Sequence, residues 1–125
     1  MRPLIFLLAA LASITPARAE VGLASWYGDH EEGRLMASGH PFHANGVNAA
    51  SRTYPFGTHL LITNLANGRQ AEVVILDRGP YVFPRILDVS RGTARMLGFE
   101  QQGLATVRIE PVPVVIPGQR SMPIP

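Results

Sequence analysis

One feature constrains the fold most strongly: an apolar segment, residues 73–76, runs directly into Asp77 and then into a Gly-Pro turn. In a β-strand alternate side chains share a face, which predicts that Val73, Ile75 and Asp77 point the same way. A carboxyl group at the end of such a strand is poorly solvated on one side, an environment that suits a general acid. The structural alternative is that Asp77 pairs with Arg78 or caps the turn.

Residues 1–19 have the pattern of a Sec-type signal peptide, with a short charged start, an apolar run over residues 4–14 and a small-residue site at Ala17-Arg18-Ala19. We expect cleavage after Ala19, because the apolar run is too short to span a bilayer. The chain contains no cysteine, so neither a lipid-carrying cysteine nor a disulfide is expected. These features predict an exported, soluble protein, periplasmic or secreted, without a membrane anchor.

The charge balance argues against nucleic acid as a partner. All eleven basic residues are arginine, and two of them lie in the predicted signal peptide, which leaves nine arginines against nine acidic residues. The remaining arginines are scattered along the chain, whereas a nucleic-acid surface needs clustered positive charge. We therefore expect no nucleic-acid binding, and we expect the protein to act as a monomer.

Short strands separated by Gly and Pro turns predict a mainly β fold. Strands are expected at 21–28, 59–63, 70–76, 85–89 and 104–110, with a brief strand or turn within 49–54. Asn67-Gly68 suits a tight hairpin turn, and Ser90 and Gly98 are expected to cap a short helix over 91–97. This pattern predicts one compact β-barrel domain over 20–112 and a Pro-rich, disordered tail over 113–125.

Six motifs in order identify a family resemblance: Ser25-Trp26-Tyr27-Gly28, Ala37-Ser38-Gly39, Arg52 to Thr58, Thr63 to Arg69, Asp77-Arg78-Gly79-Pro80 and Arg85 to Ser90. The chain resembles the catalytic domain of the RlpA (rare lipoprotein A) family of septal peptidoglycan lytic transglycosylases. The resemblance covers residues 21–112 and implies a six-stranded double-psi β-barrel with one or two short helices. It implies no metal and no organic cofactor.

The resemblance also implies a reaction on peptidoglycan. The family cleaves the bond between N-acetylmuramic acid and N-acetylglucosamine in glycan strands stripped of stem peptides, and leaves a 1,6-anhydro sugar. Because the C6 hydroxyl of the substrate attacks its own anomeric carbon, one carboxyl can act first as acid and then as base. By its motif, Asp77 matches the catalytic Asp of the family.

Two positions depart from the family pattern. His40 stands where the family has a Glu after Ala-Ser-Gly, and Ser51 stands where it has a His. Both are expected to be auxiliary residues that tune Asp77 or hold the sugar. The alternative function is a catalytically degenerate barrel that binds peptidoglycan, or a cell-wall or divisome partner, without cleaving it.

Four further residues are candidates for substrate binding. Trp26 and Tyr27 are adjacent on a predicted strand and face opposite ways, so one of them can stack on a sugar while the other packs inside. Tyr54 can contribute to the same surface, and Arg78 can reach a substrate oxygen. For Asp88 we favour a structural role, in a pair with Arg85 or in a hydrogen bond that braces a turn.

The histidines raise a separate possibility. His40 and His43 have a spacing that occurs in metal sites, with His30, Glu31 and His59 as further ligands. The alternative, a polar loop with unrelated histidines, is the one we favour.

Overall fold

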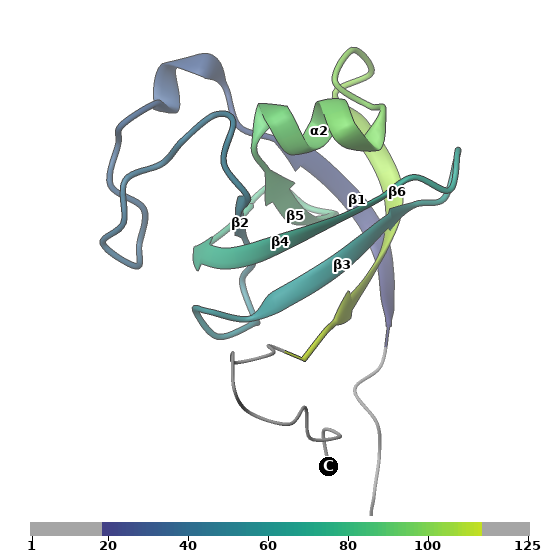
Figure 1. Cartoon of the computed structure of the whole chain (residues 1–125), viewed down its shortest axis with the longest axis horizontal. Helices are drawn as coiled ribbons and strands as arrows, with labels where there is room; N and C mark the ends of the chain where they lie inside the picture. The colour runs from purple at the N-terminus through teal and green to yellow at the C-terminus, as the bar shows by residue number, and fades with distance from the viewer. Residues whose placement is uncertain (1–18, 114–125) are drawn as a thin grey trace, which may run out of the picture.

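The computed structural model describes residues 19–113 of the 125-residue chain. Six strands form a closed barrel in the order β1-β5-β2-β4-β3-β6 (Figure 1). The elements are β1 (Glu20–Trp26), η1 (Asp29–Glu31), β2 (Asn48–Ala50), β3 (His59–Asn64), β4 (Gln70–Asp77), β5 (Arg85–Val89), α2 (Arg91–Leu97) and β6 (Leu104–Pro111). The predicted signal peptide and tail lie outside the described residues, except for Ala19 and Pro113.

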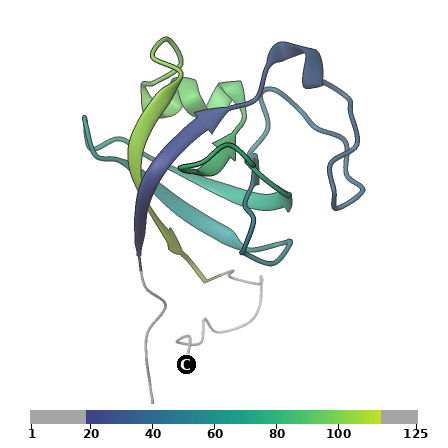
Figure 2. The same cartoon turned by 180° about the vertical axis from the view of Figure 1, so that it is seen from behind.

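The barrel contains both parallel and antiparallel strand pairs. The pairs β1·β5 and β2·β4 are parallel, whereas β1·β6, β2·β5, β3·β4 and β3·β6 are antiparallel. Closure leaves no strand edge unpaired, which removes the usual template for edge-to-edge association. The long connection between β1 and β2, residues 27–47, extends to one side of the barrel (Figure 1; seen from behind in Figure 2).

The barrel interior is filled mainly by small and branched side chains, and burial alternates clearly along β4. In β4 the buried positions are Ala71, Val73, Ile75 and Asp77, so the period of two predicted from the sequence holds for burial. Leu60, Leu87 and Val107 are fully buried and belong to the same main core. A second, smaller cluster lies under the 27–47 connection and consists of Tyr27, Met36, Phe42 and Ala50.

A register shift separates Asp77 from the rest of its strand. Ala49 lies opposite Ile75, but Ala50 lies opposite Asp77, so one extra residue of β4 is accommodated between these pairs. Such a bulge re-aims the side chains next to it. Val73 and Ile75 therefore contribute to the main core, whereas the carboxylate of Asp77 meets Tyr27 of the second cluster.

The helix begins and ends where its capping residues predict. The hydroxyl of Ser90 accepts a hydrogen bond from the backbone N–H of Thr93, and Gly98 ends α2 with a φ of 81°, in the left-handed region. Ala94 and Leu97 face the main core, as predicted. The bounds of β5 and α2 match the predicted ones, while β2 is shorter than the predicted segment and β1 ends at Trp26.

Within residues 19–113, none of the helices has the length and apolar character needed to cross a bilayer.

Candidate active site around Asp77

The carboxylate of Asp77 is buried, with 9% of the residue exposed, and three donors from different segments hold it. The hydroxyl of Tyr27 donates to Oδ2 at 2.8 Å. The backbone N–H groups of Ala37 and Arg78 donate to Oδ1 at 2.8 and 2.9 Å. Oδ1 thus accepts two backbone hydrogen bonds, while Oδ2 accepts one from a side chain and keeps acceptor capacity for a further group.

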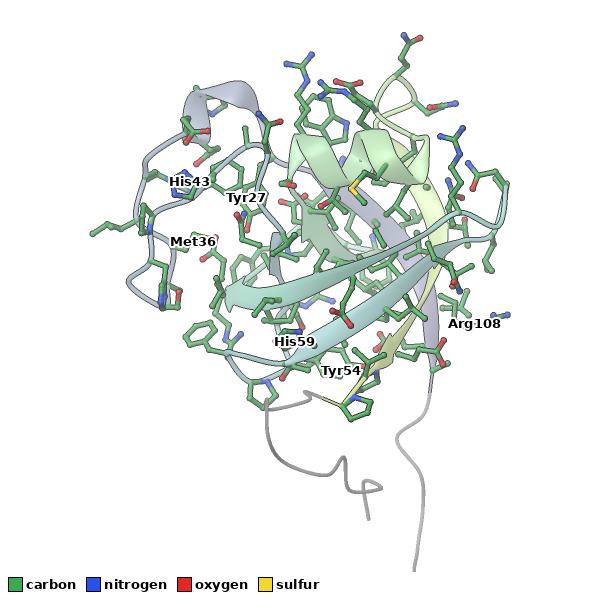
Figure 3. The ribbon with its side chains drawn as sticks, in the orientation of Figure 1. Tyr27, Met36, His43, Tyr54, His59 and Arg108 are labelled. Atoms are coloured by element: carbon green, nitrogen blue, oxygen red, sulfur yellow. The ribbon has the colours of Figure 1, made fainter. Side chains whose placement is uncertain are left out.

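Tyr27 is fixed by packing as well as by this hydrogen bond. Its ring centroid lies 4.5 Å from that of Phe42, with the rings tilted by 48°. Burial, and after it the hydrogen bond to Asp77, raises the pKa of the Tyr27 hydroxyl far above its ordinary value. The phenol is therefore neutral throughout the physiological range and can serve Asp77 as a proton donor in a hydrogen bond. Figure 3 shows Tyr27 on the same side of the barrel as Met36 and His43.

Ser51 braces the loop after β2 and does not reach the carboxylate. It is almost fully buried, and its hydroxyl accepts hydrogen bonds from the N–H groups of Thr53 and Tyr54, each at 3.1 Å. Its own N–H donates to the backbone oxygen of Asp77 at 3.2 Å. Ser51 therefore connects the loop to the end of β4 through the backbone.

Arg78 turns away from the carboxyl group of its neighbour. Its guanidinium donates to the carbonyl oxygens of Ser51 and Tyr54 at 3.1 and 3.0 Å, and its Cζ lies 3.9 Å above the ring of Phe56. These contacts tie the loop after β2 to the end of β4. The role seen here is structural, and the sequence patterns did not indicate it.

His40 lies on the exposed face of the 27–47 connection. Its Nδ1 lies 3.1 Å from the hydroxyl of Ser38, and its carbonyl accepts from the N–H of Met36 at 2.8 Å. It borders a shallow, largely apolar groove of about 330 Å³, to which Leu76, the neighbour of Asp77, also contributes. His40 thus lines the same groove as the chain neighbour of Asp77. Its ring faces solvent and this groove rather than Asp77.

Trp26 and Tyr27 face opposite ways, as predicted. Trp26 packs against the main core, its indole N–H donates to the carbonyl of Glu100 at 3.1 Å, and the guanidinium of Arg91 lies 5.4 Å from its ring. Tyr54 also packs partly against the main core. In Figure 3, Tyr54 lies toward the lower end of the barrel, away from Tyr27.

Asp88 is a second partly buried carboxyl group near the first. Ala50 of β2 pairs with Asp77 on one side and with Asp88 on the other. The hydroxyl of Ser25 donates to Oδ1 of Asp88 at 2.7 Å, and burial raises the pKa of this carboxyl group. The favoured structural role for Asp88 thus has a bracing hydrogen bond, supplied by Ser25 rather than by Arg85.

The histidines do not converge. Within the described residues no three His, Asp or Glu side chains are grouped so that they could hold a metal ion. His43 pairs with Glu32 at 3.0 Å, and His59 lies 3.7 Å from Glu72 on the other side of the barrel. The residues proposed as alternative ligands are thus divided between separate surfaces.

Sequence reasoning missed the hydrogen bond from Tyr27 to Asp77, because it joins residues fifty positions apart. It also missed the backbone N–H of Ala37, which any residue type except proline would provide. The available signal was the Trp-Tyr pair itself: one of two adjacent aromatic residues had to face away from the core.

The fold and the site together define a class: a closed six-stranded double-psi β-barrel with one buried carboxyl group at the end of β4. A family model described as "Lytic transglycolase" matches residues 19–109. The chain belongs to this family.

Curated relatives support this assignment. The chain is 43% identical over 99 residues to a probable endolytic peptidoglycan transglycosylase RlpA of Synechocystis, covering 79% of this chain and 31% of the relative. It is 41% identical over 100 residues to the endolytic peptidoglycan transglycosylase RlpA of Neisseria meningitidis, covering 80% and 41%. For the protein of that name from Pseudomonas aeruginosa the identity is 39% over 106 residues, covering 84% and 31%. The chain therefore spans less than half the length of these relatives.

Solved structures share the fold at lower identity. An expansin mutant from Clavibacter michiganensis in complex with cellohexaose superposes with a TM-score of 0.62 at 18% identity, covering 76% of this chain and 50% of the expansin. A papain inhibitor from Streptomyces superposes with a TM-score of 0.62 at 21% identity, covering 80% and 99%. At these identities the likeness establishes the barrel fold alone.

Proposed function

We propose that the protein is an endolytic peptidoglycan lytic transglycosylase that acts on glycan strands without stem peptides. The observation that carries the proposal is the asymmetric environment of the Asp77 carboxyl group. Two backbone donors occupy Oδ1, so Oδ2 is the oxygen that can hold and exchange a proton. Family membership and the names of the relatives support peptidoglycan as the substrate.

In the proposed reaction, Oδ2 of Asp77 donates a proton to the glycosidic oxygen as the bond to C1 of N-acetylmuramic acid breaks. The C6 hydroxyl of the same sugar then forms a bond to C1 and releases its proton to Oδ2. The products are a free hydroxyl on N-acetylglucosamine and a 1,6-anhydro end, and Asp77 is again protonated. Water is not consumed, so a second carboxylate that activates water is not required.

Tyr27 is a positioning residue in this mechanism. Its neutral hydroxyl donates to Oδ2 when Asp77 is ionised and can turn to accept when Oδ2 carries the proton. Ser51 positions the site through the loop after β2. His40, on the exposed connection, is assigned to contact with sugar at the rim of the groove.

The proposed substrate places the protein outside the cytoplasm. Residues 1–19 supply the proposed export signal, residues 20–112 form the barrel domain, and the protein acts as a monomer. Export can be checked by fractionating cells that produce the full chain and measuring the mass of the mature N-terminus.

A product assay tests the reaction. The purified protein is incubated with peptide-free glycan strands, and 1,6-anhydro-N-acetylmuramic acid ends are measured by mass spectrometry. Asp77→Asn should abolish the product while the thermal unfolding midpoint and the circular dichroism spectrum persist. Tyr27→Phe should lower kcat about tenfold, the equivalent of about 1.4 kcal/mol, with little change in glycan affinity. No anhydro product at high enzyme concentration would refute the proposal.

One observation favours the alternative of binding without cleavage: no titratable side chain of the described residues other than Tyr27 hydrogen-bonds to the Asp77 carboxylate. His40→Glu restores the family's residue at an exposed position and should be tolerated. Ser51→His is a poorer probe, because it removes the hydroxyl that caps Thr53 and Tyr54 in a buried turn. Product formed only by His40→Glu, with glycan binding equal in both proteins, would identify the natural chain as a binding protein.

A further inference from the structure

The loop between Asp77 and β5 presents aromatic side chains to solvent. Tyr81 is 76% exposed and Phe83 is 92% exposed, whereas Phe42 and Phe99 are each 2% exposed. A phenylalanine that packs against nothing contributes no burial to the stability of the fold. Two such residues in one short loop therefore indicate a surface kept for a ligand.

The base of this loop is held in place beside the site. A guanidinium N–H of Arg52 donates to the carbonyl oxygens of Pro80 and Arg85, which lie near the two ends of the loop. Where the loop enters β5, the N–H of Arg85 donates to the carbonyl of Val82 at 2.8 Å. The exposed aromatic residues are thus carried on an anchored turn and not on a loose segment.

The loop also starts at the catalytic position. Strands β2 and β4 are parallel, so the loops that follow them leave the same end of the barrel, and Arg52 joins these two loops. Four residues of extended chain span about 14 Å at most, which places Tyr81 within this distance of Asp77 along the backbone. A polymer bound with one linkage at Asp77 can reach the loop with its neighbouring units.

The residue types in the loop indicate which class of ligand it can bind. From Gly79 to Pro84 it carries no charged side chain, so it offers no ion pair to a nucleic acid, an acidic peptide or a lipid headgroup. Large aromatic side chains bury about 150–250 Å² each, which is well below the roughly 800 Å² per partner of a stable protein interface. Flat apolar faces of this size match the C–H faces of pyranose rings.

We propose that Tyr81 and Phe83 form an aromatic platform that stacks on sugar rings of a glycan strand whose scissile linkage lies at Asp77. This inference rests on the proposed function for its polymer. It differs from the sequence-based candidates Trp26, Tyr27 and Tyr54, whose rings pack against the two cores of the barrel.

A binding measurement tests the platform directly. The parent protein is Asp77→Asn, which prevents turnover, and the ligand is peptide-free glycan strands titrated by isothermal calorimetry. The double variant Tyr81→Ala with Phe83→Ala should raise Kd about tenfold or more, since two aromatic contacts are lost. Phe83→Trp should keep the affinity, whereas Phe83→Leu should lose it as Phe83→Ala does, because leucine is apolar but has no flat face.

Two substitutions serve as matched controls. Val82→Ala changes an exposed apolar residue in the same turn, and Met96→Ala changes an exposed one on α2. Both should leave Kd within about twofold, and every variant should unfold at the parent temperature because the altered side chains are exposed. Unchanged glycan affinity in the double alanine variant overturns the platform, and so does full affinity in Phe83→Leu.

The result is separable from the proposed function. If the wild-type protein forms anhydro product and the double alanine variant binds and cleaves equally well, the platform is wrong and the reaction stands. If the double variant loses affinity while the wild-type protein forms no product, the platform stands and the cleavage is wrong.

Discussion

At the scale of single residues, Asp77 and Asp88 show how two similar carboxyl groups acquire different environments. Both pair with Ala50 of β2, but Asp77 accepts three hydrogen bonds, whereas Asp88 accepts one, from Ser25. Burial is the largest influence on Asp88 and raises the pKa of its carboxyl group. An ionised Asp88 is therefore disfavoured in the folded protein relative to the unfolded chain.

The raised pKa of the Asp88 carboxyl group predicts that Asp88→Asn changes stability in a pH-dependent way. Between the unfolded pKa of about 3.9 and the raised folded value, the folded state binds more protons, so wild-type stability falls as pH rises through this window. Asparagine keeps an acceptor for Ser25 and carries no charge. The variant should therefore be more stable than the wild type at pH 7, and this gain should shrink toward pH 4. Urea unfolding at both pH values measures it, and an equal gain at both would contradict the assignment.

At the scale of elements, the first turn of α2 anchors the segment that leads into β2. The hydroxyl of Ser90 donates to the carbonyl of Gly46 at 2.6 Å, and the N–H of Gly92 donates to the carbonyl of Ala44 at 2.8 Å. A Cβ atom at position 92 would lie 3.0 Å from the Cα of Asn45, tighter than an ordinary contact, so the close approach favours glycine. The helix thus holds the end of the 27–47 connection against the barrel.

Ser90→Ala should therefore destabilise the protein more than the loss of a helix cap alone would. Loss of the cap costs about 1 kcal/mol, and the partly buried carbonyl of Gly46 loses its donor at a cost of about 1–2 kcal/mol. We expect a total loss of about 2–3 kcal/mol in urea unfolding. Arg95→Ala, on the exposed face of the same helix, should change the midpoint little. A loss equal to that of Arg95→Ala would show that the contact to Gly46 contributes nothing.

At the scale of the whole molecule, closure makes the barrel one cooperative unit. Every strand is hydrogen-bonded to two neighbours, and the main core receives side chains from β1, β2, β3, β4, β5 and β6 as well as from α2. A substitution that disrupts one strand therefore weakens the packing of all the others. The barrel should unfold in a single transition despite the separate second cluster.

Leu87→Ala tests this cooperativity. Leu87 is fully buried in the main core, so its truncation should cost about 2–5 kcal/mol, whereas Leu35→Ala, at a residue 69% exposed, should cost less than about 0.5 kcal/mol. Trp26, the single tryptophan, packs against the main core and reports its integrity by fluorescence. Fluorescence and circular dichroism transitions that separate would contradict a single unit.

The elements whose signals are local follow from the sequence alone. Period-two burial in β4, the caps Ser90 and Gly98 of α2 and the Asn-Gly turn before β4 depend on neighbours in the chain, and the structure agrees with them. The six ordered motifs determined the family. Asp77 is the candidate catalytic residue because it matches the catalytic Asp of the family's motif, whereas the apolar strand before it, taken alone, favours a structural role.

The surroundings of Asp77, by contrast, depend on how the whole chain packs. The register shift between β2 and β4 depends on pairing between strands distant in sequence, and it takes the carboxylate to Tyr27 and to the backbone of Ala37. Exposure is likewise a property of the packed chain: nothing local distinguishes the buried Tyr27 from the exposed Tyr81. Long-range pairing, which sequence periodicity does not encode, therefore determined which aromatic side chain holds the carboxyl group of Asp77 and which faces solvent.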